Sequence, residues 1–366
     1  MRFVAHVLAI LMLAACGSSS TGSRPSPSNA ASPSRTASPS AAVSPSPSPS
    51  PSPTPVVGTY AVLATAATSD TYTVSLIGTD GSVVSSATAS SPTSVTCGDA
   101  SAADVPLPVS TSDTRAYFLD AQGNVRFLTP NGETGIATRV AGGGNTRSIF
   151  AVSPDDQRIA VVKETFNSSG STSVLYVENL NGGGNHLQIF SETGAFSLWP
   201  VGWHAGALVV AKVSSCAGSQ PLPSGPIELH VISPTNASRI ATVGGPGCVV
   251  SLPASPAGAV CENGAFTKAN LLDWSGATRK SLTIQGPTPA YLSPDGTEVA
   301  LVVDGQTTFA GAKQTLDMVA CGWIDASHVI AGGETQSQPR VGDVVSGNIS
   351  PVAAQGLCAG RIPGSL

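Results

Sequence analysis

The sequence contains few charged residues, which make up 11% of the chain against about 25% in a typical soluble protein. Its 17 Lys and Arg and 22 Asp and Glu residues are dispersed and give a net charge of −5 without a basic cluster. Since nucleic-acid binding depends on clustered positive charge, we expect no nucleic-acid partner. The surface should instead be rich in serine, threonine, glycine and asparagine.

The short motifs that carry common chemistries are also missing. There is no GxSxG, HExxH or Walker motif, and no GxGxxG between a strand and a helix. No two cysteines have the CxxC spacing of zinc sites, and the histidines are scattered. We therefore expect no catalytic set, no cofactor and no metal site. From residue 58 onward the chain lacks the 3.6-residue apolar period of amphipathic helices, which indicates an all-β fold.

A short apolar segment opens the chain and ends at a cysteine. Arg2 precedes it, and it closes with Leu13-Ala14-Ala15-Cys16. The run is too short to span a bilayer, which favours a cleaved signal peptide. The last four residues resemble the lipobox of bacterial lipoproteins. This resemblance implies a signal peptide at residues 1–15, lipid on Cys16 and a mature chain anchored outside the cytoplasmic membrane. An ordinary signal peptide with a coincidental cysteine is the alternative.

The next segment is dominated by serine, proline, alanine and threonine. Residues 17–57 contain no Asp or Glu and no apolar period. Such a composition cannot bury enough surface to offset the entropy of ordering the chain. We therefore predict that residues 16–57 are a lipidated cysteine followed by a disordered linker, and that residues 58–366 form the globular domain.

Two segments of the globular part match each other. Residues 152–162 read VSPDDQRIAVV and residues 292–302 read LSPDGTEVALV. In each, the proline presets φ for a turn, the aspartate caps nearby backbone amides, and the apolar run that follows is a strand. The position after this aspartate is expected to adopt a positive φ. Gly296 does so without strain, whereas Asp156 does so at some cost in free energy. The turn residues are Pro154, Asp155, Pro294, Asp295 and Gly296.

This Ser-Pro-Asp-Gly turn followed by a strand resembles the repeat of TolB-like β-propellers, which are relatives of the WD-type repeat. Weaker copies of the frame begin near Ser112, Gly202, Ser255 and Gly322, mostly at intervals near the roughly 40–45 residues of a four-stranded blade. Trp203 and Trp323 stand before the turn in two copies, where we expect them to anchor one blade to another. Outer hairpins are expected around Asp80-Gly81, Asn131-Gly132, Asn181-Gly182, Thr235-Asn236 and Ser275-Gly276.

The resemblance implies a propeller of four-stranded antiparallel blades, and counting the copies together with a first blade closed by the C-terminal strand gives seven. Six is the alternative count, if residues 304–317 form only a loop. Residues 357–363 are expected to supply the innermost strand of the first blade and so close the ring. A β-sandwich would explain the strands but not the recurring turn.

Six cysteines remain once Cys16 is set aside, and an even number in an exported chain predicts three disulfides. Cys248 and Cys261 flank a segment that looks like a hairpin turn, so we expect them to face each other on neighbouring strands. A bond between Cys216 and Cys248 across adjacent blades is the competing pairing. The six candidates are Cys97, Cys216, Cys248, Cys261, Cys321 and Cys358.

The resemblance implies a binding or scaffold module with a partner at the cell envelope. We expect a monomer whose partner is an unknown envelope protein or small ligand. A propeller enzyme acting on carbohydrates or lactones is the alternative. Three or more converging Asp, Glu, His or Asn side chains in the funnel, or bound calcium, would favour the enzyme. An apolar or aromatic face would favour the binding module.

Overall fold

The computed structural model describes residues 58–66, 70–93, 95, 106–167, 170–194, 196–214, 226, 228–311, 314–334 and 337–366. The predicted leader and linker lie outside these ranges, and so do Cys16, Cys97 and Cys216. No helix occurs within the described residues, so none of them forms a helix long and apolar enough to cross a membrane.

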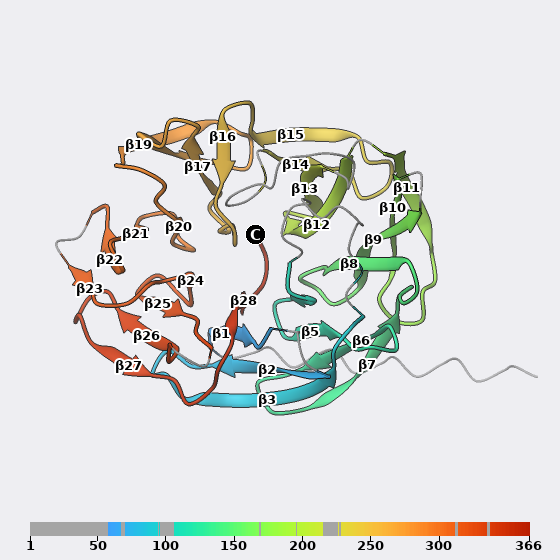
Figure 1. Ribbon diagram of the computed structural model, residues 1–366, viewed down its shortest axis with the longest axis horizontal. Helices are drawn as coiled ribbons and strands as arrows, with labels where there is room; N and C mark the ends of the chain where they lie inside the picture. The colour runs from blue at the N-terminus through green and yellow to red at the C-terminus, as the bar shows by residue number, and fades with distance from the viewer. Residues whose placement is uncertain are drawn as a thin grey trace, which may run out of the picture. The chain divides into compact units, whose positions relative to one another are not determined.

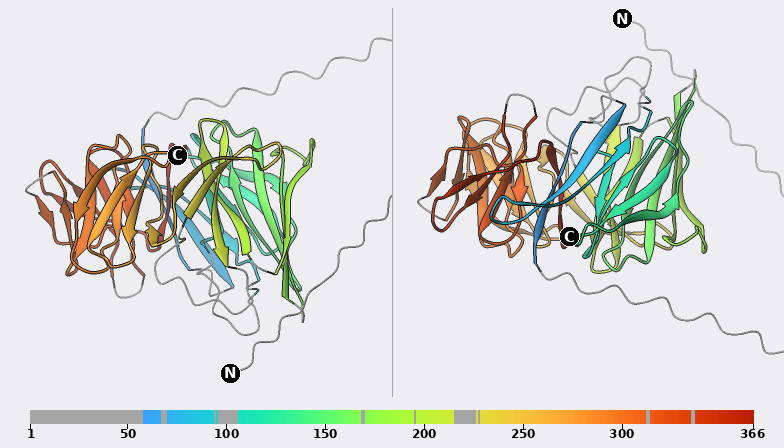
Figure 2. Two further views of the ribbon diagram at one scale, coloured as in Figure 1. Left: turned by 90° about the horizontal axis from the view of Figure 1, so that it is seen from above. Right: turned by 90° about the horizontal axis from the view of Figure 1, so that it is seen from below.

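Seven four-stranded antiparallel sheets, built from the described residues, form a ring around a central axis (Figure 1). Figure 2 shows the same ring from two sides, with the sheets standing as the blades of a propeller. The fold is therefore an all-β, seven-bladed β-propeller, as the turn repeat predicts.

The blades are numbered here in chain order, and the strands of each blade are given from the axis to the rim. Blade 1 contains β28 (Leu357–Ile362), β1 (Tyr60–Ala64), β2 (Thr71–Ile77) and β3 (Val83–Ser90). Blade 2 contains β4 (Val109–Thr111), β5 (Ala116–Leu119), β6 (Asn124–Leu128) and β7 (Thr134–Arg139). Blade 3 contains β8 (Thr146–Val152), β9 (Arg158–Asn167), β10 (Gly170–Asn179) and β11 (Leu187–Thr193). Blade 4 contains β12 (Phe196–His204), β13 (Ala207–Ser214), β14 (Glu228–Ile232) and β15 (Arg239–Gly244).

The remaining three blades follow the same order. Blade 5 contains β16 (Cys248–Val250), β17 (Ala259–Asn263), β18 (Lys268–Leu272) and β19 (Thr278–Thr283). Blade 6 contains β20 (Ala290–Leu292), β21 (Val299–Val303), β22 (Gln306–Phe309) and β23 (Thr315–Leu316). Blade 7 contains β24 (Gly322–Trp323), β25 (His328–Ala331), β26 (Arg340–Asp343) and β27 (Ile349–Pro351).

The second strands of the blades carry nearly continuous apolar runs rather than alternating ones. Every residue of 61–64 in β1 and of 159–162 in β9 is buried. This pattern arises because both faces of a blade pack against the neighbouring blades. At the rim the burial is lost, as in β19, where all but one residue is exposed. The core of the molecule therefore lies between the blades.

Blade 1 combines strands from the two ends of the propeller sequence. β28 pairs antiparallel with β1, so that Ile362 lies opposite Tyr60 and Leu357 lies opposite Ala64. This confirms the expectation that residues 357–363 supply the innermost strand of the first blade. The pairing covers an edge of β1 that would otherwise present free hydrogen-bonding groups.

The Ser-Pro-Asp turns join the first and second strands of blades 3 and 6. In both turns the aspartate Oδ1 accepts a hydrogen bond from the serine hydroxyl two residues earlier, at 2.5 Å for Asp155 and 2.6 Å for Asp295. The same oxygen accepts the backbone N–H two residues later, at 3.2 Å in each case. Asp156 and Gly296 follow with φ values of 60° and 75°. The aspartates thus act as backbone caps of turns that also contain Pro154 and Pro294.

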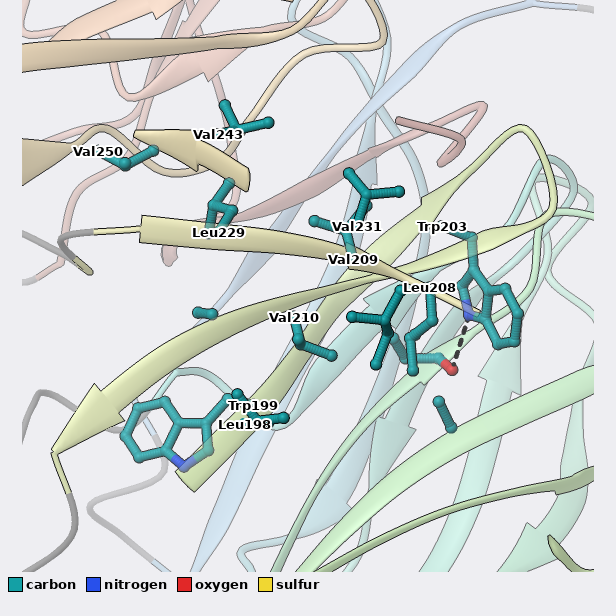
Figure 3. Close-up of a cluster of buried hydrophobic side chains, with 14 of the residues drawn as sticks. Leu198, Trp199, Trp203, Leu208, Val209, Val210, Leu229, Val231, Val243 and Val250 are labelled. Atoms are coloured by element: carbon teal, nitrogen blue, oxygen red, sulfur yellow. Dashed lines mark hydrogen bonds between the residues drawn. The ribbon is translucent and has the colours of Figure 1, made fainter. Parts of the chain in front are cut away.

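Two tryptophans connect neighbouring blades near the axis. Trp203 in β12 donates its Nε1–H to the carbonyl of Ala151 in blade 3, at 3.2 Å, within a buried apolar cluster (Figure 3). Trp323 in β24 donates to the carbonyl of Tyr291 in blade 6, at 2.8 Å. Both indole rings are buried. The predicted role as anchors between blades is therefore confirmed.

Within residues 304–317, the described residues 304–311 and 314–317 include the outer strands of blade 6 and are not merely a loop. Asp304 and Gly305 have φ values of 50° and 80° and form a two-residue turn, with Val303 opposite Gln306. Positive φ at both positions is typical of the type I′ hairpin turn. β23 then pairs with β22. The six-blade alternative is therefore wrong.

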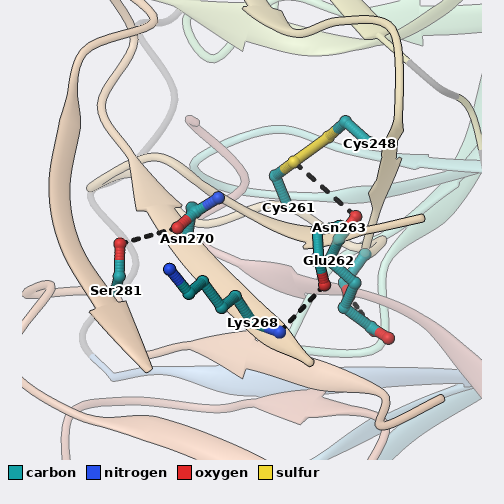
Figure 4. Close-up of a disulfide and its surroundings, with 8 residues drawn as sticks. Cys248, Cys261, Glu262, Asn263, Lys268, Asn270 and Ser281 are labelled. Atoms are coloured by element: carbon teal, nitrogen blue, oxygen red, sulfur yellow. Dashed lines mark hydrogen bonds between the residues drawn. A yellow bond between two sulfur atoms is a disulfide. The ribbon is translucent and has the colours of Figure 1, made fainter. Parts of the chain in front are cut away.

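Blade 5 contains a disulfide within one sheet. Cys248 and Cys261 are bonded, with their Cα atoms 5.5 Å apart (Figure 4). The predicted pairing is confirmed, and the competing bond from Cys216 to Cys248 is wrong. The two cysteines are not directly opposite, because Cys248 pairs with Asn263 and Cys261 pairs with Val250. The bond therefore runs diagonally across the strand pair.

A second disulfide joins the two blades on either side of the ring closure. Cys321, directly before β24 of blade 7, is bonded to Cys358 in β28 of blade 1, with their Cα atoms 6.0 Å apart. Sequence reasoning counted both cysteines as candidates without pairing them. The bond ties the closing strand to the blade beside it.

Candidate functional site

A cavity of about 530 Å³ lies along the axis of the ring, and we call it the axial cavity. All seven blades line it, mainly through their innermost strands or the residues that follow these strands. It falls in the size range of small-molecule sites, which span roughly 300–1,000 Å³. The axial cavity is therefore the candidate functional site.

Most of the cavity wall is apolar side chain or backbone. Asp120 is the one Asp or Glu side chain among its described lining residues. Oδ1 of Asp120 accepts the backbone N–H groups of Gln122 and Asn124, at 3.0 and 2.9 Å, and Oδ2 accepts the Asn124 amide. This carboxylate therefore stabilises a turn. Within the described residues no group of three or more His, Cys, Asp or Glu side chains is placed to hold a metal ion.

Arg147, one of two cations that line the cavity, is neutralised by a buried partner. Its Nε and Nη2 lie 2.8 and 2.6 Å from Oε2 of Glu164, which is 4% exposed. Trp199 donates its Nε1–H to the other oxygen of Glu164, at 2.9 Å. The guanidinium also lies over the rings of Phe166 and Trp199. Arg147 is thus part of a saturated network between blades 3 and 4.

Arg361, the other cation, has no such partner. It lies in β28 and lines the cavity, but its guanidinium makes no hydrogen bond or ion pair with any described residue. Burial lowers the pKa of its guanidinium, whereas Asp113 and Asp325 raise it electrostatically. The site therefore contains one cation whose donors are not used by the part of the chain that the structure describes.

The residues after β28 cross the centre of the ring, where Figure 1 shows Leu366 at the label C. Gly364 N donates to the carbonyl of Ser112 in blade 2, at 2.8 Å. Leu366 N donates to the carbonyl of Trp203 in blade 4, at 2.9 Å, and His204 Nδ1 donates to the Leu366 oxygen at 2.6 Å. The segment thereby fixes blades 2 and 4 to the closing strand, and it lines part of the cavity.

The structure brings only some of the sequence-predicted residues to this cavity. Cys321, Cys358 and Pro294 line it, whereas Cys248 and Cys261 lie in blade 5 outside its wall. Sequence reasoning missed Arg361 altogether. No local signal marked it, because its lack of partners is a property of the closed ring.

A buried histidine lies in blade 4, away from the cavity wall. His230 is 3% exposed, and its Nε2 lies 3.1 Å from Oε1 of Glu228. Burial lowers the pKa of His230 below its ordinary value, and Arg239 and Lys212 act in the same direction against Glu228. As the pH falls, His230 is therefore protonated at a higher pH in the unfolded chain than in the folded protein.

This histidine predicts a loss of stability on acidification. As the pH falls below about 6.5, the ordinary pKa of histidine, the unfolded state is favoured by its extra proton. Thermal melts at several pH values should show a steeper decline for the wild type than for His230→Gln. His186→Gln, which alters an exposed histidine, is the control and should decline like the wild type. Equal declines for the wild type and His230→Gln would contradict the assignment.

The comparisons with known proteins concern the fold alone. No protein-family model matches the chain, and no curated protein matches it significantly. Among solved structures it is similar to the Dos1 propeller, with a TM-score of 0.43 and 12% identity over 82% of this chain and 85% of that one. It is also similar to Hsv2 of Kluyveromyces lactis (TM-score 0.36, 9% identity, 69% of this chain and 98% of that one). A third is an oligogalacturonate lyase in complex with manganese (TM-score 0.35, 10% identity, 77% and 70%).

Proposed function

We propose that this chain is a monomeric binding protein that works outside the cytoplasmic membrane, anchored by lipid on Cys16. Its propeller would recognise a small ligand or an envelope partner. The observation that supports binding most directly is the axial cavity, with apolar walls and one acidic side chain that already caps a turn. An enzyme acting on carbohydrates or lactones needs converging acidic or amide side chains, and the described lining residues offer less support for it.

Four observations support the proposed location and partner. The disulfides Cys248–Cys261 and Cys321–Cys358 are compatible with an oxidising compartment outside the cytoplasm. The lipobox resemblance at residues 13–16 provides the anchor, and the serine- and proline-rich linker provides reach from the membrane surface. The turn repeat that resembles TolB-like propellers supports a partner at the cell envelope.

The anchor predicts a clear result for Cys16→Ser. This variant should lose incorporation of radiolabelled palmitate and should move from the membrane fraction to the soluble fraction, because serine lacks the thiol that accepts the lipid. Ser18→Ala, two residues away, is the control and should keep both properties. Continued labelling of Cys16→Ser, or an unlabelled wild type, would overturn the proposed anchoring.

Recognition itself is tested by crosslinking in intact cells, followed by mass spectrometry of what is attached to the chain. We expect a reproducible set of envelope components or a small bound molecule. Turnover of sugars or lactones by the purified chain, without any specific crosslinked neighbour, would instead favour the enzyme.

A further inference from the structure

The guanidinium of Arg361 has hydrogen-bond donors that no described residue uses. An arginine side chain carries five N–H donors in a planar fork that matches the oxygens of a carboxylate, sulfonate or phosphate. Within the described residues none of these donors is used, although Arg361 is one of the residues that line the axial cavity. A partly buried cation with free donors is stabilised when an anion reaches it.

The carboxylates that act on Arg361 are already occupied. Oδ1 of Asp113 accepts the N–H and the hydroxyl of Ser365, at 3.2 and 2.8 Å. Oδ1 of Asp325 accepts two backbone N–H groups of its own turn, at 2.7 and 2.8 Å. Neither carboxylate forms an ion pair with Arg361 in the described part of the chain. They attract the guanidinium without satisfying its donors.

Tyr291 offers a second polar group in the wall of the axial cavity. It lies in β20 of blade 6, whereas Arg361 lies in β28 of blade 1. Gly322 of blade 7, the blade between them, lines the cavity without a side chain. Among the described residues the Tyr291 hydroxyl has no hydrogen-bond partner, and burial raises its pKa, so it remains protonated and can donate.

The rest of the wall favours an apolar body. Leu292 follows Tyr291 in β20, and Trp323 follows Gly322 in β24; both residues line the cavity. Phe150 and Val201 line it from blades 3 and 4. An apolar cavity with few polar groups selects ligands that combine an apolar body with one matching head group.

We propose that the axial cavity binds a small organic acid, with its anionic head on Arg361 and the Tyr291 hydroxyl and its apolar body along the cavity wall. This inference rests on the proposed binding function and names the ligand class of the same site.

The test uses two fluorescent probes that share one ring system. 1-Anilinonaphthalene-8-sulfonate carries an anionic head, and N-phenyl-1-naphthylamine lacks it. The purified full chain should bind one equivalent of the sulfonate at least about tenfold more tightly than the neutral probe, a difference of about 1.4 kcal/mol. Octanoate should displace the sulfonate, whereas inorganic phosphate, which has no apolar body, should not.

Variants assign the preference to its residue. Arg361→Gln should reduce the affinity for the sulfonate to that for the neutral probe, and Tyr291→Phe should weaken sulfonate binding severalfold. Arg279→Gln, which removes an exposed arginine on the rim strand β19, should bind like the wild type. Should Arg361→Gln fail to fold, Arg361→Lys keeps the charge and should retain a preference for the anion.

Equal affinities of the wild type for the two probes would overturn the inference, and so would an undiminished preference in folded Arg361→Gln. Either result would leave the proposed binding function standing, because that function is tested by crosslinking in cells. Conversely, the chain could bind the anionic probe specifically and yet give no crosslinked neighbour in cells. That result would contradict the envelope partner and would leave the ligand class standing.

Discussion

Replacing Arg147 with methionine should lower the free energy of unfolding by about 3–5 kcal/mol, the usual cost of leaving one charge of a buried pair without its partner. Arg147 and Glu164 are 10% and 4% exposed, and Oε2 of Glu164 lies within hydrogen-bonding distance of two guanidinium nitrogens. Without Arg147, the Trp199 N–H is the one charge-stabilising contact that the Glu164 carboxylate keeps among the described residues. Denaturant unfolding of the purified chain measures the loss.

A second substitution separates the charge from the packing. In the double variant Arg147→Met with Glu164→Gln, the amide oxygen of the glutamine still accepts from Trp199, but no charge is left buried. Most of the lost stability should therefore return. Arg279→Gln removes one member of an exposed ion pair and should change stability by about 1 kcal/mol or less. If Arg147→Met costs no more than this control, the network does not stabilise the fold.

Removing the disulfide that fastens the closing strand should have the second largest effect. The double variant Cys321→Ser with Cys358→Ser should lose about 3–4 kcal/mol, from the chain entropy that a bond across 37 residues removes from the unfolded state. Denaturant unfolding under oxidising conditions measures it. Limited proteolysis should also cut near β28 sooner than in the wild type, because the strand then loses its covalent link to blade 7.

The other described disulfide supplies the comparison. Cys248 and Cys261 are separated by only 13 residues and belong to one blade. Replacing both by serine should therefore cost less, about 3 kcal/mol, and should leave the proteolysis of β28 unchanged. The reverse order of the two effects would contradict this account of ring closure.

Much of the propeller could be predicted because its turns are local. The turns at Asp80-Gly81 and Asn131-Gly132 join strand pairs β2–β3 and β6–β7, and chemistry confined to a few residues determines such hairpins. The closing strand at residues 357–363 could also be predicted, from the blade that it completes. Blade 6 is harder to predict, because β22 and β23 have only four and two residues.

The candidate site could not be predicted in the same way. Arg361 follows Gly360 in a segment without any motif, and its significance arises only where seven strands from distant parts of the chain surround one axis. The bond between Cys321 and Cys358 likewise depends on blade 7 lying beside blade 1. Long-range neighbours of this kind follow from the closed topology and not from spacing along the sequence.

The pairing of Ile362 with Tyr60 also means that blade 1 can be completed only after the last strand of the propeller is available. Synthesis and export both begin at the N-terminus, so blade 1 remains a three-stranded fragment until residues 357–362 have emerged. Throughout that interval the bare flank of β1 is available to any other unpaired strand. A nascent or truncated chain that lacks these residues is therefore a natural client for chaperones and proteases.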